Sequence, residues 1–265
     1  MSQTAPLGPR EWDAVGYDSL DLPHRQWGQW VLGALALRGD ERVVDLGAGT
    51  GRDTATLLQR LPRGHVIAVD ASTAMLAALR GKLADADPAR LSVRRADLEA
   101  PLNLGEPVDA VVSVATLHWL RDHQSLFRRI YGLLRPGGVF RAEWGGAGNV
   151  ANVDAVLAEQ HAPRVAEMAH YTTVEQTRRR LATAGFVDVY VETVTGMTVV
   201  ASDDQWDMLL RSVVLGPVLD QLPPEQHAPL LNHVTDRVRD EGVRYVRLHT
   251  HARRPADRIA EPSAG

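Results

Sequence analysis

The sequence of 265 residues contains no cysteine, which excludes disulfide bonds, thiolate metal ligands and a cysteine nucleophile. Surplus charge of one sign is also lacking, because the formal net charge is only −4 and offers no general attraction for nucleic acid or an anionic membrane. Arg178-Arg179-Arg180 is the one dense basic stretch, and a solvated helix face is the simpler interpretation of so short a run. We therefore expect neither nucleic acid nor a membrane as a partner.

Long apolar runs are missing as well. No stretch approaches the roughly 18 apolar residues that a membrane span needs, and residues 1–10 lack the apolar core of a signal peptide. The hydrophobic share of 45% is ordinary for a globular protein, and the chain is long enough to bury the core of one large domain. We expect a cytoplasmic protein, and the sequence leaves open whether it is a monomer or a homodimer.

Apolar runs alternate with helical patterns over the first 145 residues. Short apolar runs bounded by turn residues predict buried strands at 42–46, 65–70, 91–95, 108–114 and 139–144. Apolar residues at helical spacing predict helices at 24–37, 50–61, 72–83 and 124–134. This alternation predicts βαβ units and a parallel sheet with helices on both faces. The less regular remainder predicts a helix at 173–184, a strand at 186–193, two helices within 203–241 and a last strand at 245–253.

A glycine-rich loop follows the first strand. Gly47, Gly49 and Gly51 stand between that strand and the next helix, where the backbone has to approach a ligand closely with positive φ. A dinucleotide site requires a third glycine where Arg52 stands, and a P-loop requires a lysine that is absent here. The loop therefore indicates a nucleotide-like ligand of another kind, with a plain tight turn as the alternative.

Two aspartates stand at the ends of the next two strands. Asp70 ends H-V-I-A-V-D, and Asp97 follows the third strand in R-R-A-D-L. Open α/β sheets bind ligands at the carboxyl ends of their strands, and a carboxylate can accept from both hydroxyls of a diol. Aspartates in such places also serve as plain turn residues.

Together these motifs resemble those of class I S-adenosylmethionine-dependent methyltransferases. The resemblance covers about residues 15–145 and includes V-V-D-L-G-A-G-T-G, the two aspartates, D-A-V-V-S-V and L-L-R-P-G-G-V-F. It implies S-adenosyl-L-methionine as the cofactor and S-adenosyl-L-homocysteine as the product. It also implies contacts with the cofactor at the loop (Asp45, Gly47, Ala48, Gly49, Gly51), the ribose (Asp70, Ala71), the adenine (Met75, Asp97, Leu98), the end of the fourth strand (Ser113) and an N-terminal segment folded over it (Tyr17).

The same resemblance implies a single methyltransferase domain over residues 1–265. Its fold is α/β, a Rossmann-like, doubly wound, seven-stranded and mostly parallel sheet whose last strand is antiparallel, with helical lid insertions. We expect an N-terminal helical cap at 1–40, a cofactor-binding core at 41–145, and substrate-lid insertions at 146–172 and 195–242.

The segment A-T-L-H-W after the fourth strand resembles the trans-aconitate methyltransferase group and related actinobacterial small-molecule methyltransferases, in which this turn lies between cofactor and acceptor. His118 is the candidate catalytic residue, because an imidazole can orient an acceptor or take its proton near neutral pH. A hydrogen-bonded structural histidine is the alternative. His118, Trp119 and Trp144 are the candidate contacts of the acceptor, with ordinary core packing as the alternative for Trp119.

The chemistry of the acceptor is only partly readable. Methyl transfer from a sulfonium is an in-line displacement with an activated leaving group, so a carboxylate acceptor needs no base, whereas an amine or carbon acid often does. The N-P-P-Y box of enzymes that methylate bases or protein amides is absent, with S-V-A-T at 113–116 instead. We favour O-methylation of a small molecule, with a carboxylate as one candidate acceptor, over C- or N-methylation in natural-product biosynthesis. Two further functions stay open, namely an NAD-dependent oxidoreductase, against which Arg52 argues, and a non-catalytic cofactor-binding module.

The predicted last strand carries an unusual polar set on alternate residues. Tyr245, Arg247, His249 and His251 share one face, and two interpretations remain open. Either these side chains line a pocket or bind an anion, or the strand lies near the edge of the sheet with a polar face. Two histidines at this spacing suit a metal, but no third ligand of suitable spacing stands nearby, so we predict no metal site.

Overall fold

The computed structural model of the protein describes residues 10–14, 16 and 24–257. The strands of its sheet are β1 (Arg42–Leu46), β2 (His65–Asp70), β3 (Leu91–Arg95), β4 (Val108–Val114), β5 (Leu134–Gly145), β6 (Val187–Thr198) and β7 (Val243–Arg253). The α-helices are α2 (His24–Gly33), α3 (Arg52–Arg60), α4 (Thr73–Lys82), α5 (His123–Leu133), α6 (Ala151–Glu159), α7 (Val165–Met168), α8 (Val174–Thr183), α9 (Asp203–Leu209), α10 (Gly216–Leu219) and α11 (Pro224–Val238). A 3-10 turn, η1 (Leu117–Trp119), follows β4, and a π-helical turn, η2 (Leu210–Val214), joins α9 to α10.

The seven strands lie in the order β3-β2-β1-β4-β5-β7-β6. β1 pairs in parallel with β2 and β4, β2 with β3, and β4 with β5. β7 is antiparallel to both of its neighbours. The predicted doubly wound, seven-stranded sheet with an antiparallel last strand is therefore confirmed.

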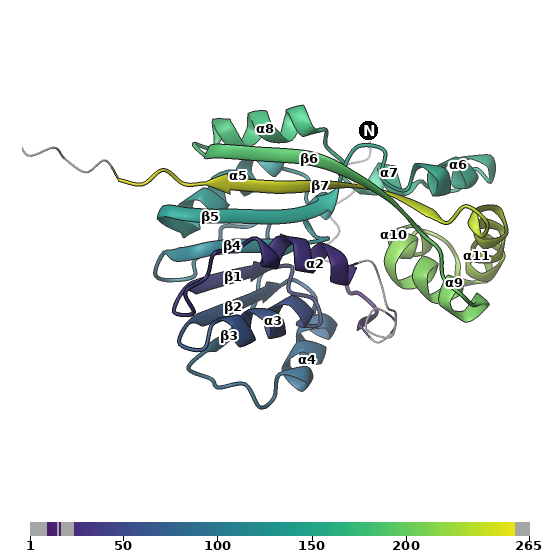
Figure 1. Ribbon diagram of the computed structural model, residues 1–265. Helices are drawn as coiled ribbons and strands as arrows, with labels where there is room; N and C mark the ends of the chain where they lie inside the picture. The colour runs from purple at the N-terminus through teal and green to yellow at the C-terminus, as the bar shows by residue number, and fades with distance from the viewer. Residues whose placement is uncertain (1–9, 15, 17–23, 258–265) are drawn as a thin grey trace, which may run out of the picture.

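Alternate strand residues face opposite layers of helices, because side chains along a strand point to its two faces in turn. Val43, Val66 and Val112 pack with α2 and α3, while the adjacent Val44 and Val111 pack with α5. All five valines are fully buried, which explains why these strands are nearly continuous apolar runs. Figure 1 shows α2 and α3 on the viewer's side of the sheet.

The helices α6, α7 and α9 to α11 form a lid beyond the carboxyl ends of the parallel strands (Figure 1). The lid has a core of its own, in which Trp206, Leu210 and Val234 are at most 1% exposed. β6 runs to Thr198 and not to residue 193 as predicted, because residues 195–198 continue to pair with β7. The two long antiparallel strands thereby connect the sheet to the lid.

The polar set of the last strand is covered by helix α2. β7 lies second from the edge of the sheet, between β5 and the edge strand β6, so it is near the edge as one interpretation held, but its Tyr245, Arg247 and His249 are buried. Arg247 is 3% exposed and forms an ion pair with the fully buried Glu143 of β5. Its guanidinium carbon lies 4.0 Å from the ring centroid of Trp27, and the ring of His249 stacks on Trp30 at 3.9 Å. Aromatic rings of α2 thus pack over buried polar groups.

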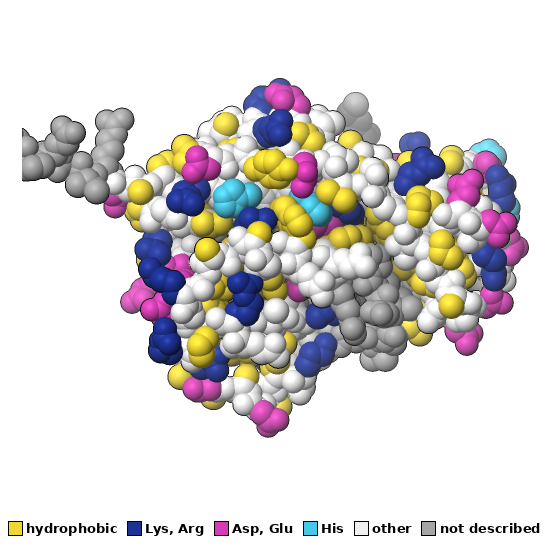
Figure 2. All heavy atoms as spheres, viewed as in Figure 1, with side chains coloured by type: hydrophobic (Ala, Val, Ile, Leu, Met, Phe, Trp, Pro, Cys, Tyr) yellow, Lys and Arg dark blue, Asp and Glu magenta, His cyan; other side chains and the backbone are white. Residues whose placement is uncertain are grey.

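Three properties of the described residues bear on what the protein can bind. Within the part of the chain that the structure describes, no helix is long and apolar enough to cross a membrane. Across the same residues, no group of three histidine, aspartate or glutamate side chains is placed to hold a metal ion. On the face that Figure 2 shows, basic and acidic side chains are interspersed among the described residues.

Candidate active site

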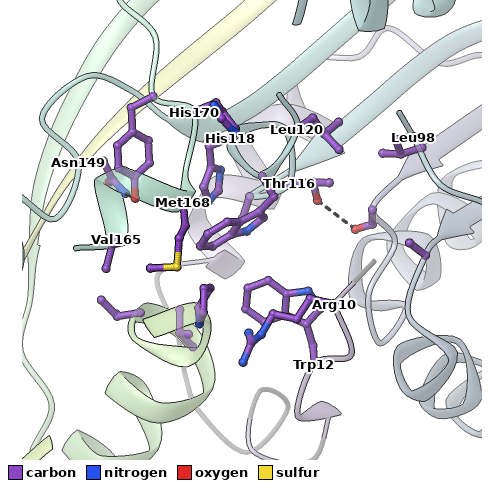
Figure 3. Close-up of a pocket in the computed structure, with 18 of the residues that line it drawn as sticks. Arg10, Trp12, Leu98, Thr116, His118, Leu120, Asn149, Val165, Met168 and His170 are labelled. Atoms are coloured by element: carbon purple, nitrogen blue, oxygen red, sulfur yellow. Dashed lines mark hydrogen bonds between the residues drawn. The ribbon is translucent and has the colours of Figure 1, made fainter. Parts of the chain in front are cut away.

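A cavity of about 1070 Å³ lies at the carboxyl ends of the parallel strands, between the sheet and the lid. Loops after β1 to β4 line one end of it, and the lid and β7 line the other. Figure 3 shows Leu98 at the first end, Asn149 and Met168 at the second, and His118 between them. One continuous space therefore joins the predicted cofactor loop to the predicted acceptor residues.

The glycine loop, residues 47–51, lies against the turn that follows β4. Gly47 has φ +73°, and a Cβ there would lie 2.0 Å from the hydroxyl oxygen of Thr116. Gly49 has φ +54° and no atom within 4 Å of the corresponding position. Both residues line the cavity, so the backbone itself forms this part of the wall.

Asp70 holds the glycine loop to the end of β2. Its Oδ2 accepts the backbone N–H of Gly49 at 2.9 Å, and its Oδ1 accepts that of Ser72 at 2.9 Å. Burial raises the pKa of the Asp70 carboxyl, and these backbone hydrogen bonds oppose the rise. Each oxygen keeps a further lone pair, so the carboxylate can still accept hydrogen bonds from a ligand in the cavity.

The other predicted cofactor residues fall into three groups. Those that line the cavity beside Gly47, Gly49 and Asp70 are Ala71, Met75, Asp97 and Leu98. Those that are buried behind the cavity wall are Asp45, Ala48, Gly51 and Ser113. Asp45 accepts the hydroxyl of Thr54 at 2.6 Å, and Ser113 donates to the carbonyl of Leu46 at 2.7 Å, so both support the strand ends from within. Tyr17 lies outside the described residues.

A short N-terminal segment touches both sides of the cavity; the sequence predicted an N-terminal segment folded over the cofactor, but it did not single out Arg10 or Glu11 for this role. The carboxylate of Glu11 accepts the hydroxyl of Ser72 at 2.7 Å and two backbone N–H groups in the first turn of α4. These bonds, led by that of Ser72, lower the pKa of Glu11 to about 2. Arg10 forms an ion pair of 2.5 Å with Asp220 after α10 and lies 4.3 Å from the ring centroid of Trp12. The segment thus links the cofactor end to the lid.

Two carboxyl groups with raised pKa values, those of Asp45 and Asp53, flank the glycine loop in the sequence. Burial raises the pKa of Asp45 to about 7, with the charges of Asp53 and Asp70 adding to the rise and the hydrogen bond from Thr54 opposing it. Burial also raises the pKa of Asp53 to about 6. Near neutral pH the ionised form of Asp45 therefore costs free energy in the folded state.

Replacing Asp45 with asparagine is expected to increase the stability of the protein, relative to wild type, more at alkaline pH than at acidic pH. Because the folded pKa of about 7 lies above the ordinary 3.8, the stabilising contribution of Asp45 is complete below about pH 4 and is lost as the pH rises through about 7. Asparagine cannot ionise and keeps an oxygen for the hydroxyl of Thr54. The change in melting temperature, variant minus wild type, should be roughly 6–12 °C more favourable at pH 8.5 than at pH 5, since the two pH units between pH 5 and the folded pKa correspond to about 3 kcal/mol.

The matched control for this comparison is Asp85→Asn, since Asp85 is exposed in the turn after α4. Its difference from wild type should be the same at both pH values. If Asp45→Asn also showed the same difference at both, the raised pKa of Asp45 would be refuted.

His118 is fixed at the centre of the cavity wall. Its side chain is 5% exposed and packs between Trp119 and Tyr171, with ring centroids 4.7 Å and 5.8 Å away. Its Nδ1 accepts the backbone N–H of Gly145 at 3.3 Å. An accepting Nδ1 carries no proton, so the proton of the neutral imidazole is on Nε2, which makes Nε2 a donor.

β7 brings further polar side chains to the acceptor end. Tyr245 and Arg247 line the cavity together with Asn149 and Tyr171, and we call these four residues the polar corner. Asn149 donates to the hydroxyl oxygen of Tyr171 at 3.1 Å. The hydroxyl of Tyr245 is buried and makes no hydrogen bond to any described residue. The polar residues at alternate positions of the last strand indicated that Tyr245 and Arg247 could line a pocket. Nothing in the sequence singled out Asn149 or Tyr171.

Trp144 does not line the cavity, which corrects its prediction as an acceptor contact. It is fully buried on the other face of β5, with its ring centroid 6.4 Å from that of His123 and 6.3 Å from that of Phe127. Neighbouring residues of a strand face opposite ways, and Glu143 faces Arg247 on the α2 side, so Trp144 faces α5. The remaining two candidates, His118 and Trp119, do line the cavity.

The chain is similar to a known protein family and to individual proteins of known activity. A family described as a methyltransferase domain matches residues 43–138, which span β1 to the start of β5. A trans-aconitate 2-methyltransferase from Methylobacterium radiotolerans is 28% identical over 239 residues, covering 85% of this chain and 88% of that protein.

Solved structures of lower identity share the fold. Phosphoethanolamine N-methyltransferase 2 from Haemonchus contortus, in complex with S-adenosyl-L-methionine, has a TM-score of 0.60 at 19% identity and covers 87% of this chain and 52% of its own. The cyclase SpnF has a TM-score of 0.58 at 17% identity and covers 88% and 81%. Since a cyclase has the same fold, the fold alone does not determine the reaction.

Proposed function

Because the chain belongs to the class I S-adenosylmethionine-dependent methyltransferases, we propose that it methylates a carboxylate oxygen of a small molecule held beside His118. The observation that carries this proposal is the single cavity that runs from the glycine loop to His118 and the polar corner. In-line displacement requires donor and acceptor in one space from which water is excluded.

The residues at one end of the cavity fit the cofactor. The glycine loop offers backbone without side chains, Asp70 offers free lone pairs, and Met75 and Leu98 offer apolar surface with Asp97 beside them. We expect these groups to hold the methionine part, the ribose and the adenine in that order. When bound, the cofactor supplies a methyl group activated by its positively charged sulfur.

The acceptor end suits a group that needs no base. The relative from Methylobacterium radiotolerans is named for trans-aconitate, a carboxylic acid. The Gly145 N–H holds His118 as a donor at Nε2, which suits it to orient a carboxylate and not to remove a proton. The carboxylate oxygen donates an electron pair to the methyl carbon as the carbon–sulfur bond breaks toward sulfur, and no proton moves.

Two further expectations from the sequence belong to this proposal. We expect the enzyme to act in the cytoplasm, and as a monomer or a homodimer. C- or N-methylation is the competing reaction, and the experiment below separates the acceptor atoms.

The test is transfer of an isotope-labelled methyl group from S-adenosylmethionine to a panel of carboxylic acids, amines and phenols. We expect label in products that mild alkali hydrolyses, because methyl esters are labile and N-methyl or C-methyl groups are stable. Labelled products that all survive alkali would overturn carboxylate methylation. Cofactor binding without transfer to any class of acceptor would overturn the enzymatic proposal for these substrates.

Substitution of His118 tests its role as a positioning donor. His118→Ala should lower kcat/KM about 10- to 100-fold, since one hydrogen bond to a charged acceptor is lost. His118→Gln keeps an N–H donor and should recover a large part of that loss, with the pH–rate profile of the wild type. An acidic limb of unit slope that disappears in His118→Gln would instead identify His118 as a general base.

A further inference from the structure

The acceptor end of the cavity has two surfaces of different character. One is the polar corner, and the second is an apolar wall of the lid, formed by Val165, Met168, Val214 and Pro217. Figure 3 shows Val165 and Met168 on the same side of the cavity as Asn149. A ligand that fills this end touches both surfaces.

The polar corner offers three hydrogen-bond donors. Arg247 uses Nε and Nη2 for Glu143, and its Nη1 makes no hydrogen bond to a described residue. The hydroxyl of Tyr171 already accepts from Asn149, so its own proton is available, and the hydroxyl of Tyr245 has no described partner. Burial raises the pKa of both tyrosines, and nearby Arg247 opposes the rise, so both hydroxyls stay protonated at neutral pH.

A buried hydroxyl without a partner is costly, which indicates a ligand that completes its hydrogen bonding. Tyr245 is 4% exposed, and its ring centroid lies 5.9 Å from the guanidinium carbon of Arg247. A carboxylate accepts up to four hydrogen bonds and matches several donors that meet at one place. The polar corner therefore fits one carboxylate.

The remaining charges of the cavity do not suit a second or third carboxylate. Apart from Asp70 and Asp97 at the cofactor end, carboxyl groups and arginines are equal in number in the lining: Glu99, Glu167 and Asp220 against Arg10, Arg121 and Arg247. Arg10 is paired with Asp220, and Arg247 with Glu143. An acceptor with several negative charges would face a lining that is balanced or negative.

We propose that the acceptor is a monocarboxylic acid with an apolar body, its carboxylate in the polar corner and its body against the apolar wall. This inference rests on the proposed function and narrows it to one substrate class. It differs from the tricarboxylic acid for which the bacterial relative is named. Methylation removes the charge that the polar corner binds, which favours release of the neutral ester.

The first experiment compares octanoate with trans-aconitate as acceptors under identical conditions. We expect kcat/KM for octanoate to exceed that for trans-aconitate at least 100-fold. A preference for trans-aconitate would overturn the inference and leave carboxylate methylation intact. Transfer to neither acid, with transfer to an amine or phenol, would overturn the proposed function itself.

The second experiment uses Tyr245→Phe, which removes only the hydroxyl. We expect KM for octanoate to rise about 10-fold, with an unchanged dissociation constant for S-adenosylhomocysteine and an equal or higher melting temperature. If the affinity for S-adenosylhomocysteine fell by the same factor, the polar corner would bind the cofactor's own carboxylate and the inference would fail. An unchanged KM would also refute it.

The third experiment tests the apolar wall with Met168→Glu. A charge there should lower kcat/KM for octanoate at least 10-fold more than for acetate. The matched control is Met197→Glu, because Met197 is 47% exposed on β6 and does not line the cavity. Equal losses for both acids in Met168→Glu would show that the wall does not contact the body of the acceptor.

Discussion

Replacing Asp70 with alanine is expected to weaken binding of S-adenosylhomocysteine at least about 100-fold. The carboxylate accepts N–H groups from Gly49 and Ser72, each at 2.9 Å, and it lines the cavity where we expect the ribose. Hydrogen bonds to a charged group are worth about 1.5–3 kcal/mol each, and alanine replaces none of them. The substitution therefore loosens the glycine loop and removes the acceptor for the ribose at the same time.

Calorimetric titration of S-adenosylhomocysteine into the purified variants measures this effect. Asp70→Asn keeps one accepting oxygen and should fall between wild type and alanine. Asp85→Ala, an exposed aspartate in the same half of the chain, should bind like wild type. Wild-type affinity in a folded Asp70→Ala protein would contradict the placement of the cofactor.

The central strands were predictable because the residues that define each strand are neighbours in the sequence. Each of β1 to β4 is a short apolar run between turn residues, and all four begin and end at the predicted residues. β5 begins at Leu134 and not at residue 139, since Leu134 pairs with Val108 before the register shifts. β6 is longer than predicted because its last residues depend on pairing with β7, which lies far away in the sequence.

Site residues were predictable where a characteristic residue type stands at the end of a strand. They were not predictable where their position depends on the pairing of strands that are far apart in the sequence. Asp70 ends its strand, Asp97 follows its strand, and both line the cavity as expected for this fold. Alternation in β5 shows that Glu143 and Trp144 face opposite ways, but only the helices packed on the sheet decide which one meets the cavity side. Arg247 pairs with a residue 104 positions earlier, which no local pattern shows.

The same long-range pairing explains why the polar set of β7 was ambiguous. A polar face is acceptable at an exposed edge and also inside a sheet when each charge finds a partner. Arg247 finds Glu143 only because β7 enters between β5 and β6. Because β7 lies between β5 and β6, its Tyr245 and Arg247 form part of the polar corner of the cavity and do not lie on the surface.

Replacing Gly47 with alanine is expected to destabilise the whole domain by about 3 kcal/mol or more. The added Cβ would lie 2.0 Å from Oγ1, 2.4 Å from Cγ2 and 2.6 Å from Cβ of Thr116, so the turn after β4 has to move. The φ of +73° adds about 1–2 kcal/mol for any residue with a Cβ. Thermal unfolding should show a fall of roughly 6–12 °C in the melting temperature.

Gly49→Ala is the matched comparison, because its φ of +54° carries the same backbone cost while its Cβ meets no atom within 4 Å. It should lose only about 1–2 kcal/mol of stability, yet weaken cofactor binding, since the methyl group enters the cavity that Gly49 lines. In a double-mutant cycle, Thr116→Gly should recover part of the stability lost in Gly47→Ala and none of that lost in Gly49→Ala. Equal stability losses in the two alanine variants, without coupling to Thr116, would show that the loop does not need glycine at position 47 for its packing.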